Sequence, residues 1–223
     1  MDTNRTYARG FVIRILSMLF GLFLYALGIV LTINANIGYA PWEVFHIGLA
    51  NHIGFTLGIT SIFVGFVIVV TVTLLKEKLG LGTIASMFLT GIFIDLIRAV
   101  NIIPVVNNFA VGIVMLAAGL FVTSTGSFFY MRSAFGAGPR DNLMVVLSRR
   151  TKMPIGVCRG IVELTVTIVG WLLGGMVGIG TVIAGFAIGF CIQITFTLLK
   201  FDAKAVPHET LRQTLNLLLH KTE

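Results

Sequence analysis

The stretch "FGAGPRDNL" (135–143) places two glycines, a proline and an Arg-Asp pair between long apolar segments. A stretch 98 residues earlier, "IGYAPWEVF" (37–45), has a glycine, a proline and an acidic residue at matching positions. The matched residues are Gly38 and Gly136, Pro41 and Pro139, and Glu43 and Asp141. Proline at the first helical position and an acid in the first turn signal a helix start. Each stretch is therefore predicted to form a turn, which Gly38, Gly136 and Gly138 permit, followed by a short helix.

The same 98-residue offset extends outward in both directions. "LGLGT" (79–83) falls on "VGIGT" (177–181), and seven of the ten glycines between positions 21 and 95 fall on another glycine. No gap is needed to keep this register. Self-similarity at a fixed offset indicates an internal duplication. We therefore expect repeat 1 at about 11–103 and repeat 2 at about 108–200.

The composition indicates a membrane protein. Hydrophobic residues make up 57% of the chain and charged residues 11%, against about 25% charged residues in soluble domains, and the mean hydropathy is +0.98. A spanning helix needs roughly 17–25 residues. Six segments reach that length: about 15–33, 57–75, 79–97, 108–131, 155–175 and 177–199.

The predicted fold is a single all-α integral membrane domain over 1–223, with six transmembrane helices. Each repeat contains three spans and one short additional helix after its Gly-Pro turn. Because three is an odd number, the second repeat is expected to lie inverted in the bilayer relative to the first. Inverted repeats recur in transporters, with the substrate site at the repeat interface.

The positive charges predict the orientation. Lys and Arg cluster in alternate connections between the apolar segments, which places both termini in the cytoplasm. The same clustering argues against nucleic-acid binding, although the net charge is +7. The tail 201–223 has leucines at helical spacing and is expected to form an amphipathic helix at the inner membrane face.

Two placements of the short helices, about 41–54 and 139–152, remain open. In the first they are re-entrant, so that their N-termini face a polar cavity inside the protein, where non-helical backbone is tolerated. In the second they lie at the interface, with Trp42 among the lipid headgroups and the basic residues of 149–152 facing anionic lipid.

Charged residues inside the apolar segments are candidate functional groups. Arg159 and Glu163 stand four residues apart in the fifth segment, where an unpaired charge costs about 2.5–3.5 kcal/mol. They are expected either to form a pair that locks the helices together or to line a cavity with Arg140 and Asp141. Asp95, near the outer end of the third segment, is expected to pair with Arg98, with ion coupling as the alternative.

These residues predict a protein that binds or transports a small polar or anionic solute at the repeat interface. The candidate solute-binding residues are Arg140, Asp141, Asn142, Arg159, Glu163, Trp42 and Glu43. The alternative is a non-transporting scaffold or regulator that acts through its cytoplasmic loops and tail. A polar cavity joining the charged residues would favour transport, whereas a dry bundle would favour the scaffold.

No catalytic constellation, metal-binding pattern or nucleotide-binding motif is visible in the sequence. We therefore expect no enzymatic activity, no catalytic residue, no cofactor and no metal. The expected partners are the lipid bilayer and a small-molecule solute. A homo-oligomer and a separate energising subunit both remain open.

Three stretches, "FGAGPRDNL", "ANIGYAPWEV" (35–44) and "GVCRGIVELTV" (156–166), resemble the YczE/YyaS/YitT-type bacterial integral membrane proteins over roughly residues 10–200. G-x-G-P-R-D followed by R-x-x-x-E is fairly specific to the YczE branch. That motif falls on Gly136, Gly138, Pro139, Arg140, Asp141, Arg159 and Glu163. The resemblance implies a multi-pass protein of the bacterial inner membrane and gives no substrate.

Overall fold

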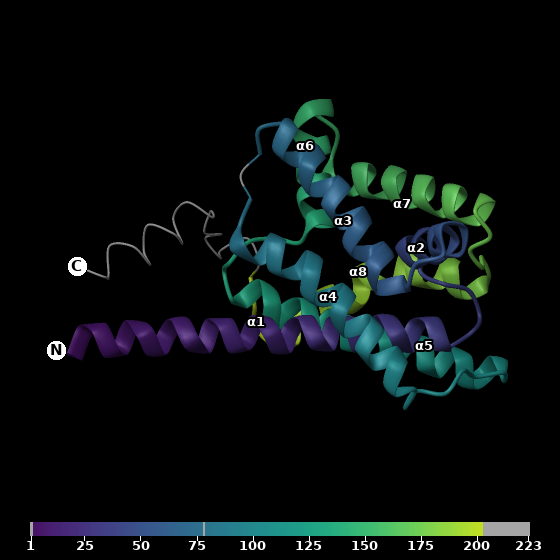
Figure 1. The fold of residues 1–223 in the computed structure, drawn as a ribbon, viewed down its shortest axis with the longest axis horizontal. Helices are drawn as coiled ribbons and strands as arrows, with labels where there is room; N and C mark the ends of the chain where they lie inside the picture. Colours follow the sequence, from purple (N-terminus) through teal and green to yellow (C-terminus); the bar gives the residue numbers. More distant parts are fainter. Residues whose placement is uncertain (1, 78, 203–223) are drawn as a thin grey trace.

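The computed structural model describes residues 2–77 and 79–202, which form helices and connecting turns (Figure 1). The helices are α1 (Asp2–Asn34), α2 (Pro41–Ile53), α3 (Leu57–Leu74), α4 (Leu81–Val100), α5 (Phe109–Arg132), α6 (Pro139–Thr151), α7 (Ile155–Leu172) and α8 (Ile179–Leu198). The predicted all-α class is confirmed. The predicted amphipathic helix of the tail lies outside the described residues.

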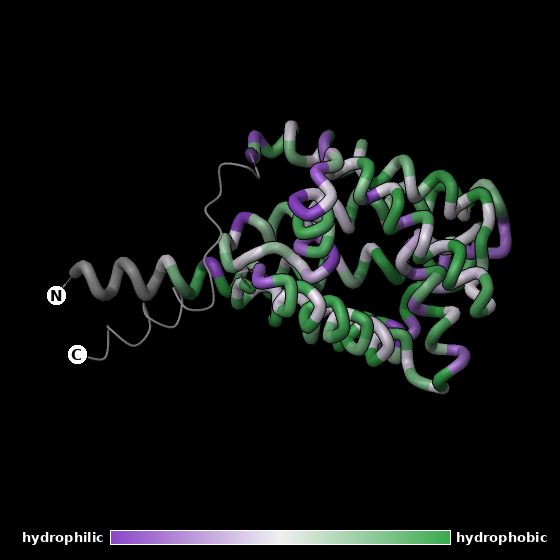
Figure 2. The backbone as a smooth tube through the Cα atoms, turned by 90° about the horizontal axis from the view of Figure 1, so that it is seen from above, coloured by the Kyte–Doolittle hydropathy of each residue, from purple (hydrophilic) through white to green (hydrophobic). Residues whose placement is uncertain are grey.

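Five helices are long and apolar enough to cross a membrane: Gly10–Asn34 of α1, and α3, α4, α5 and α8. A sixth crossing is reached when α6 and α7 count as one span bent by 119°. Five of the six predicted spans are therefore present as single helices, and the one predicted at 155–175 qualifies only together with α6. Figure 2 shows hydrophobic residues along most of the length of the helices and hydrophilic ones mainly near helix ends and turns.

The two predicted short helices are present. Both α2 and α6 begin at the expected proline and run for 13 residues, too short for either to span a membrane alone. The bounds of α2, α3 and α4 recur 98 residues later as the bounds of α6, α7 and α8.

Helices α1 and α5 form the most extensive helix contact in the described structure. They cross antiparallel at four glycines, because a Cβ added at Gly21 would lie 2.8 Å from the Gly126 carbonyl oxygen and one at Gly28 would lie 2.7 Å from that of Gly119. Any larger residue would push the two backbones apart. Glycine at these positions therefore allows the closest packing, as in other membrane helix pairs.

The turn before each short helix is docked on the other half of the chain. Gly38 and Gly136 have φ values of 116° and 117°, a region that favours glycine. Gly82 donates its backbone N–H to the Phe135 carbonyl at 2.7 Å, and Gly180 donates to the Ile37 carbonyl at 2.8 Å. These bonds hold the N-termini of α2 and α6 inside the protein.

Candidate functional site

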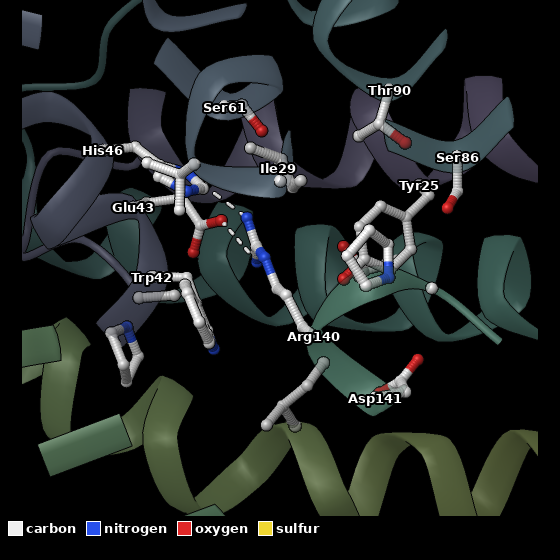
Figure 3. A pocket seen from close by; sticks show the side chains of 18 of the residues that line it. Tyr25, Ile29, Trp42, Glu43, His46, Ser61, Ser86, Thr90, Arg140 and Asp141 are labelled. Atoms are coloured by element: carbon white, nitrogen blue, oxygen red, sulfur yellow. Dashed lines mark hydrogen bonds and ion pairs between the residues drawn. The ribbon is translucent and has the colours of Figure 1, made fainter. Parts of the chain in front are cut away.

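A cavity of about 150 Å³ lies between the helices, and residues from all eight of them line it (Figure 3). We call it the central cavity. A dry cavity of about this volume holds a benzene-sized molecule. Its polar lining consists of Tyr25, Thr32, Glu43, His46, Ser61, Ser86, Thr90, Thr123, Tyr130, Arg140, Asp141, Arg159 and Glu163.

The first turns of both short helices line the central cavity. Pro41, Trp42 and Glu43 come from α2, and Pro139 and Arg140 come from α6. Trp42 is 8% exposed, so its ring lies inside the protein. This placement agrees with the cavity-facing alternative for the short helices and not with a tryptophan among lipid headgroups.

Arg140 joins α6 to α2. Its Nη1 atom lies 3.4 Å from the Oε1 atom of Glu43, and its Nη2 atom lies 3.3 Å from the Nδ1 atom of His46. The guanidinium also lies over the Trp42 ring, 4.8 Å from the centroid. Figure 3 shows Arg140 extending toward Glu43 and His46. Because Glu43 is buried, an ionised carboxylate there depends on a cation such as Arg140.

His46 has a defined protonation pattern because of this contact. A guanidinium can only donate hydrogen bonds, so the Nδ1 atom of His46 must accept and the proton of the neutral ring must sit on Nε2. His46 is 2% exposed, and its Nε2 atom is buried with no hydrogen-bond partner among the described residues. A buried unsatisfied donor costs about 1–3 kcal/mol. His46, which lines the cavity, therefore carries a buried donor without an acceptor.

Asp141 is held by Tyr130. The tyrosine hydroxyl donates to the Oδ2 atom of Asp141 at 3.0 Å and accepts the backbone N–H of Gly138 at 2.9 Å. Tyr130 is buried at the end of α5. The hydroxyl thus fixes the acidic residue and the turn that precedes it. In Figure 3, Asp141 and Tyr25 lie on the opposite side of Arg140 from Glu43 and His46.

Arg159 and Glu163 form an ion pair on α7, with 2.7 Å between the arginine Nε atom and the Oε1 atom of Glu163. The side chains are 41% and 15% exposed, respectively. Both also line the central cavity. The two alternatives expected for these residues, a mutual pair and a place in the cavity wall, are therefore compatible.

Two candidates from the sequence lie away from the cavity lining. Asn142 donates to the hydroxyl of Thr83 at 3.2 Å and to the Ala137 carbonyl at 3.3 Å, so it anchors α6 to α4. Asp95 accepts the backbone N–H of Gly58 at 2.8 Å and the hydroxyl of Thr56. Its carboxylate therefore caps the N-terminus of α3.

Eight polar cavity residues were not among the sequence candidates, and the largest three of them are Tyr25, His46 and Tyr130. A signal for His46 was available, because it follows Glu43 by three positions and so shares its helix face. The tyrosines lie in long apolar segments, where one hydroxyl adds little to the pattern. In the described part of the chain, no group of three or more His, Cys, Asp or Glu side chains is placed to hold a metal ion.

Comparisons with known proteins place these residues in a family context. A model described as "Family of unknown function (DUF6198)" matches residues 12–197. The chain is 32% identical to the Uncharacterized membrane protein YczE of Bacillus subtilis, over 78% of this chain and 81% of that protein. It is 31% identical to an uncharacterized protein of Haemophilus influenzae, over 82% and 83% of the two chains. The Uncharacterized protein YyaS of Bacillus subtilis is 26% identical, over 81% and 90%. No solved structure matches.

Proposed function

This chain belongs to the family of unknown function DUF6198, and the names of its relatives state no activity. We therefore propose its function from the geometry of the central cavity. The protein binds a small polar or anionic solute in this cavity and carries it across the bacterial inner membrane. The role is not enzymatic. The site comprises Arg140, Asp141, Arg159 and Glu163 with Trp42, Glu43 and His46, all of which line the cavity.

The observation that carries the proposal is the His46 ring, whose Nε2 donor is buried without a partner while its Nδ1 atom lies against the Arg140 guanidinium. Two neighbouring donors in a buried wall match a hydrogen-bond acceptor such as a carboxylate. Arg140 keeps donors for a solute, because its hydrogen bonds to Glu43 and His46 use one N–H group each and a guanidinium has five N–H groups. The Arg140 end of the cavity therefore takes the solute's acceptor group.

The other end of the cavity has a different character. Asp141 accepts a hydrogen bond from the neutral hydroxyl of Tyr130, whereas Glu43 and Glu163 each pair with an arginine. Asp141 thus contributes a negative charge that the ion pairs in this wall do not balance, on the same side of Arg140 as Tyr25 (Figure 3). An ammonium or hydroxyl donor suits this end. A solute with a carboxylate and a donor group, such as a small zwitterion, satisfies both ends.

The helix packing supports a site between inverted repeats. Gly21 of α1 meets Gly126 of α5, and Gly28 meets Gly119. At the 98-residue offset, Gly119 is the copy of Gly21 and Gly126 is the copy of Gly28. Such a reciprocal antiparallel contact is what a pseudo-two-fold axis in the membrane plane produces. Under this proposal the central cavity corresponds to the substrate site of inverted-repeat transporters.

The scaffold alternative predicts a dry, closed bundle. The lining of the central cavity includes Arg140, Asp141 and Glu163 together. A polar cavity of this size is costly to maintain unless water or a solute satisfies it. The solute-binding role is therefore the better supported of the two.

The proposal can be tested on purified protein with three probes of similar size: L-alanine, lactate and 2-aminopropan-1-ol. Alanine has both a carboxylate and an ammonium group, lactate lacks the ammonium, and the amino alcohol lacks the carboxylate. A ligand present at a hundred times its Kd contributes about 2.7 kcal/mol to the stability of the folded state. We expect alanine to raise the unfolding temperature most, lactate less, and 2-aminopropan-1-ol not at all.

His46→Ala and His52→Ala form a matched pair of variants for this experiment. His46 faces the cavity, whereas His52 is exposed at the end of α2. The stabilisation by alanine and lactate should disappear in His46→Ala and persist in His52→Ala. Equal stabilisation by all three probes, stabilisation by none, or an identical response of both variants would overturn the proposal.

A further inference from the structure

The two halves of the chain differ in the packing partner of one helix, which is α3 in the first half and its copy α7 in the second. α3 lies along α4, whereas the described residues give no comparable packing of α7 on α8. Instead, α7 packs extensively on α2 (Figure 1). This difference arises although the bounds of α7 and α8 are those of α3 and α4 displaced by 98 residues.

The α3–α4 crossing is built from glycine. A Cβ added at Gly58 would lie 2.1 Å from the Gly91 carbonyl oxygen, and one added at Gly91 would lie 2.5 Å from that of Gly58. The two backbones are therefore in direct contact. Further along, the absence of a side chain at Gly65 leaves room for Met87, whose Cβ atom would lie 3.7 Å from an added Cβ.

The same glycines are present in the other half without the crossing. Gly156 and Gly189 are the copies of Gly58 and Gly91, and an added Cβ at either would meet nothing within 4 Å. Gly189 lies in the middle of α8, where glycine costs about 0.5–1 kcal/mol relative to alanine, and packing in this structure gives no reason for it there. Gly156, in the first turn of α7, has no packing neighbour either. The copies of Gly65 and Met87 are Glu163 and Gly185. The second half therefore also combines a glycine with a large side chain at these two positions, but with the glycine on the other helix.

From this asymmetry we infer that the structure is one of two states of the protein. In the second state α7 lies along α8 through Gly156 and Gly189, and α3 has moved away from α4. The inference rests on the proposed function, since α3 and its copy α7 both line the central cavity, through Ser61 and Arg159 at corresponding positions. Replacing the α3–α4 packing by α7–α8 packing would close the cavity wall on the α7 side and open the wall on the α3 side. Alternating access requires an exchange of this kind.

A cap on α7 would accompany the exchange. In this structure the Asp95 carboxylate of α4 accepts the backbone N–H of Gly58 at the start of α3. The copies of these residues are Gln193 of α8 and Gly156 of α7. The side-chain amide of Gln193 donates to Thr197 at 3.4 Å, so its amide oxygen can accept the Gly156 N–H in the second state.

Two pairs of engineered cysteines report the two states in a variant in which Cys158 and Cys191 are replaced by alanine. Gly65→Cys with Met87→Cys reports the structure described here, because a Cβ–Cβ distance of 3.7 Å suits a disulfide. Gly160→Cys with Gly189→Cys reports the second state. Its template is Ile62 of α3, whose Cγ1 atom would lie 2.6 Å from a Cβ at Gly91.

Both pairs should cross-link in native membranes with a copper–phenanthroline oxidant, and the products should migrate as monomers. Gly156→Leu should reduce the Gly160→Cys/Gly189→Cys cross-link at least tenfold, because the leucine blocks the close crossing. It should leave the Gly65→Cys/Met87→Cys cross-link unchanged. Val157→Leu is the control, because Val157 is exposed on the neighbouring position of α7.

Two results would overturn the inference: no Gly160→Cys/Gly189→Cys cross-link where the other pair reacts fully, or equal effects of Gly156→Leu and Val157→Leu. The cross-links are measured without solute. Their failure would leave binding of alanine or lactate at the cavity unaffected, and failure of that binding would leave the cross-links interpretable.

Discussion

Arg140 connects the two short helices through side chains that lie 97 and 94 residues away along the chain. Its guanidinium is planar, so it donates to Glu43 and His46 while its face lies against Trp42. An ammonium group cannot reproduce that combination. At the residue scale, the site therefore depends on the shape of this side chain as well as on its charge.

Replacing Arg140 with lysine should destabilise the protein even though the charge is kept. The change removes at least one charge-assisted hydrogen bond, each worth about 1.5–3 kcal/mol, and the stacking on Trp42. Arg149→Lys is the control, because the Arg149 side chain is 66% exposed and pairs with Glu77 at 2.8 Å, where such a pair contributes about 0–1 kcal/mol. Unfolding in detergent should show a clear loss of stability for Arg140→Lys only. Equal losses of stability in the two variants would mean that Arg140 is not part of a specific site.

Glu163→Gln should cost more than the double change Arg159→Gln with Glu163→Gln. Removing the carboxylate alone leaves the Arg159 guanidinium partly buried without its partner. Because Arg159 is 41% exposed, we expect a coupling below the about 3–5 kcal/mol of fully buried pairs. A double-mutant cycle of unfolding free energies measures it, and strict additivity would mean that the two charges do not interact.

At the scale of helices, the contact of α1 with α5 holds the two halves of the chain together. Thr123 approaches Gly28 so closely that an added Cβ would lie 2.2 Å from its hydroxyl oxygen and 2.6 Å from its backbone nitrogen. A backbone atom cannot rotate away as a flexible side chain can. The separation of the helices is therefore set by glycine at this position.

Gly28→Ala should consequently destabilise the protein by about 1–3 kcal/mol, the range for inserting a methyl group into a packed interior. Gly10→Ala on the same helix is the matched control, since an added Cβ there meets nothing within 4 Å. That change should be neutral or stabilising, because alanine favours helix more than glycine does. Thermal unfolding of both variants tests the crossing, and a tolerated Gly28→Ala would contradict the packing of α1 on α5.

At the scale of the whole molecule, the chain is a multi-pass helical membrane protein. Its Lys and Arg residues cluster in alternate connections between the apolar segments. Its orientation remains a prediction from the distribution of Lys and Arg, with both termini in the cytoplasm. Asn107, before α5, should face outward, and Thr151, at the end of α6, should face inward. Both residues are exposed in the structure.

Cysteine labelling tests this orientation directly. The native cysteines Cys158 and Cys191 are buried and should give little background. An impermeant maleimide should label Asn107→Cys on intact cells, and should label Thr151→Cys only after the membrane is permeabilised. The opposite pattern would reverse the orientation, and labelling of both on intact cells would exclude a crossing between them.

The sequence predicted the starts of α2 and α6 because the signals for a helix start are local: Pro41 and Pro139 sit at the first position, with an acid two residues later. It did not predict that Arg140 contacts Glu43 and His46, because contacts between helices depend on how they cross. Tyr130 was missed for a related reason. Its hydroxyl acquires a role only where the turn at Gly138 folds back onto α5.

The place of Trp42 in the cavity wall has an optical consequence. The chain has two tryptophans: Trp42 is 8% exposed and lies under the Arg140 guanidinium, whereas Trp171 is 61% exposed on α7. In Trp171→Phe the indole emission would come from the cavity wall alone. A molecule entering beside Arg140 would shift the wavelength or intensity of that emission, so occupancy can be followed in real time without an attached dye.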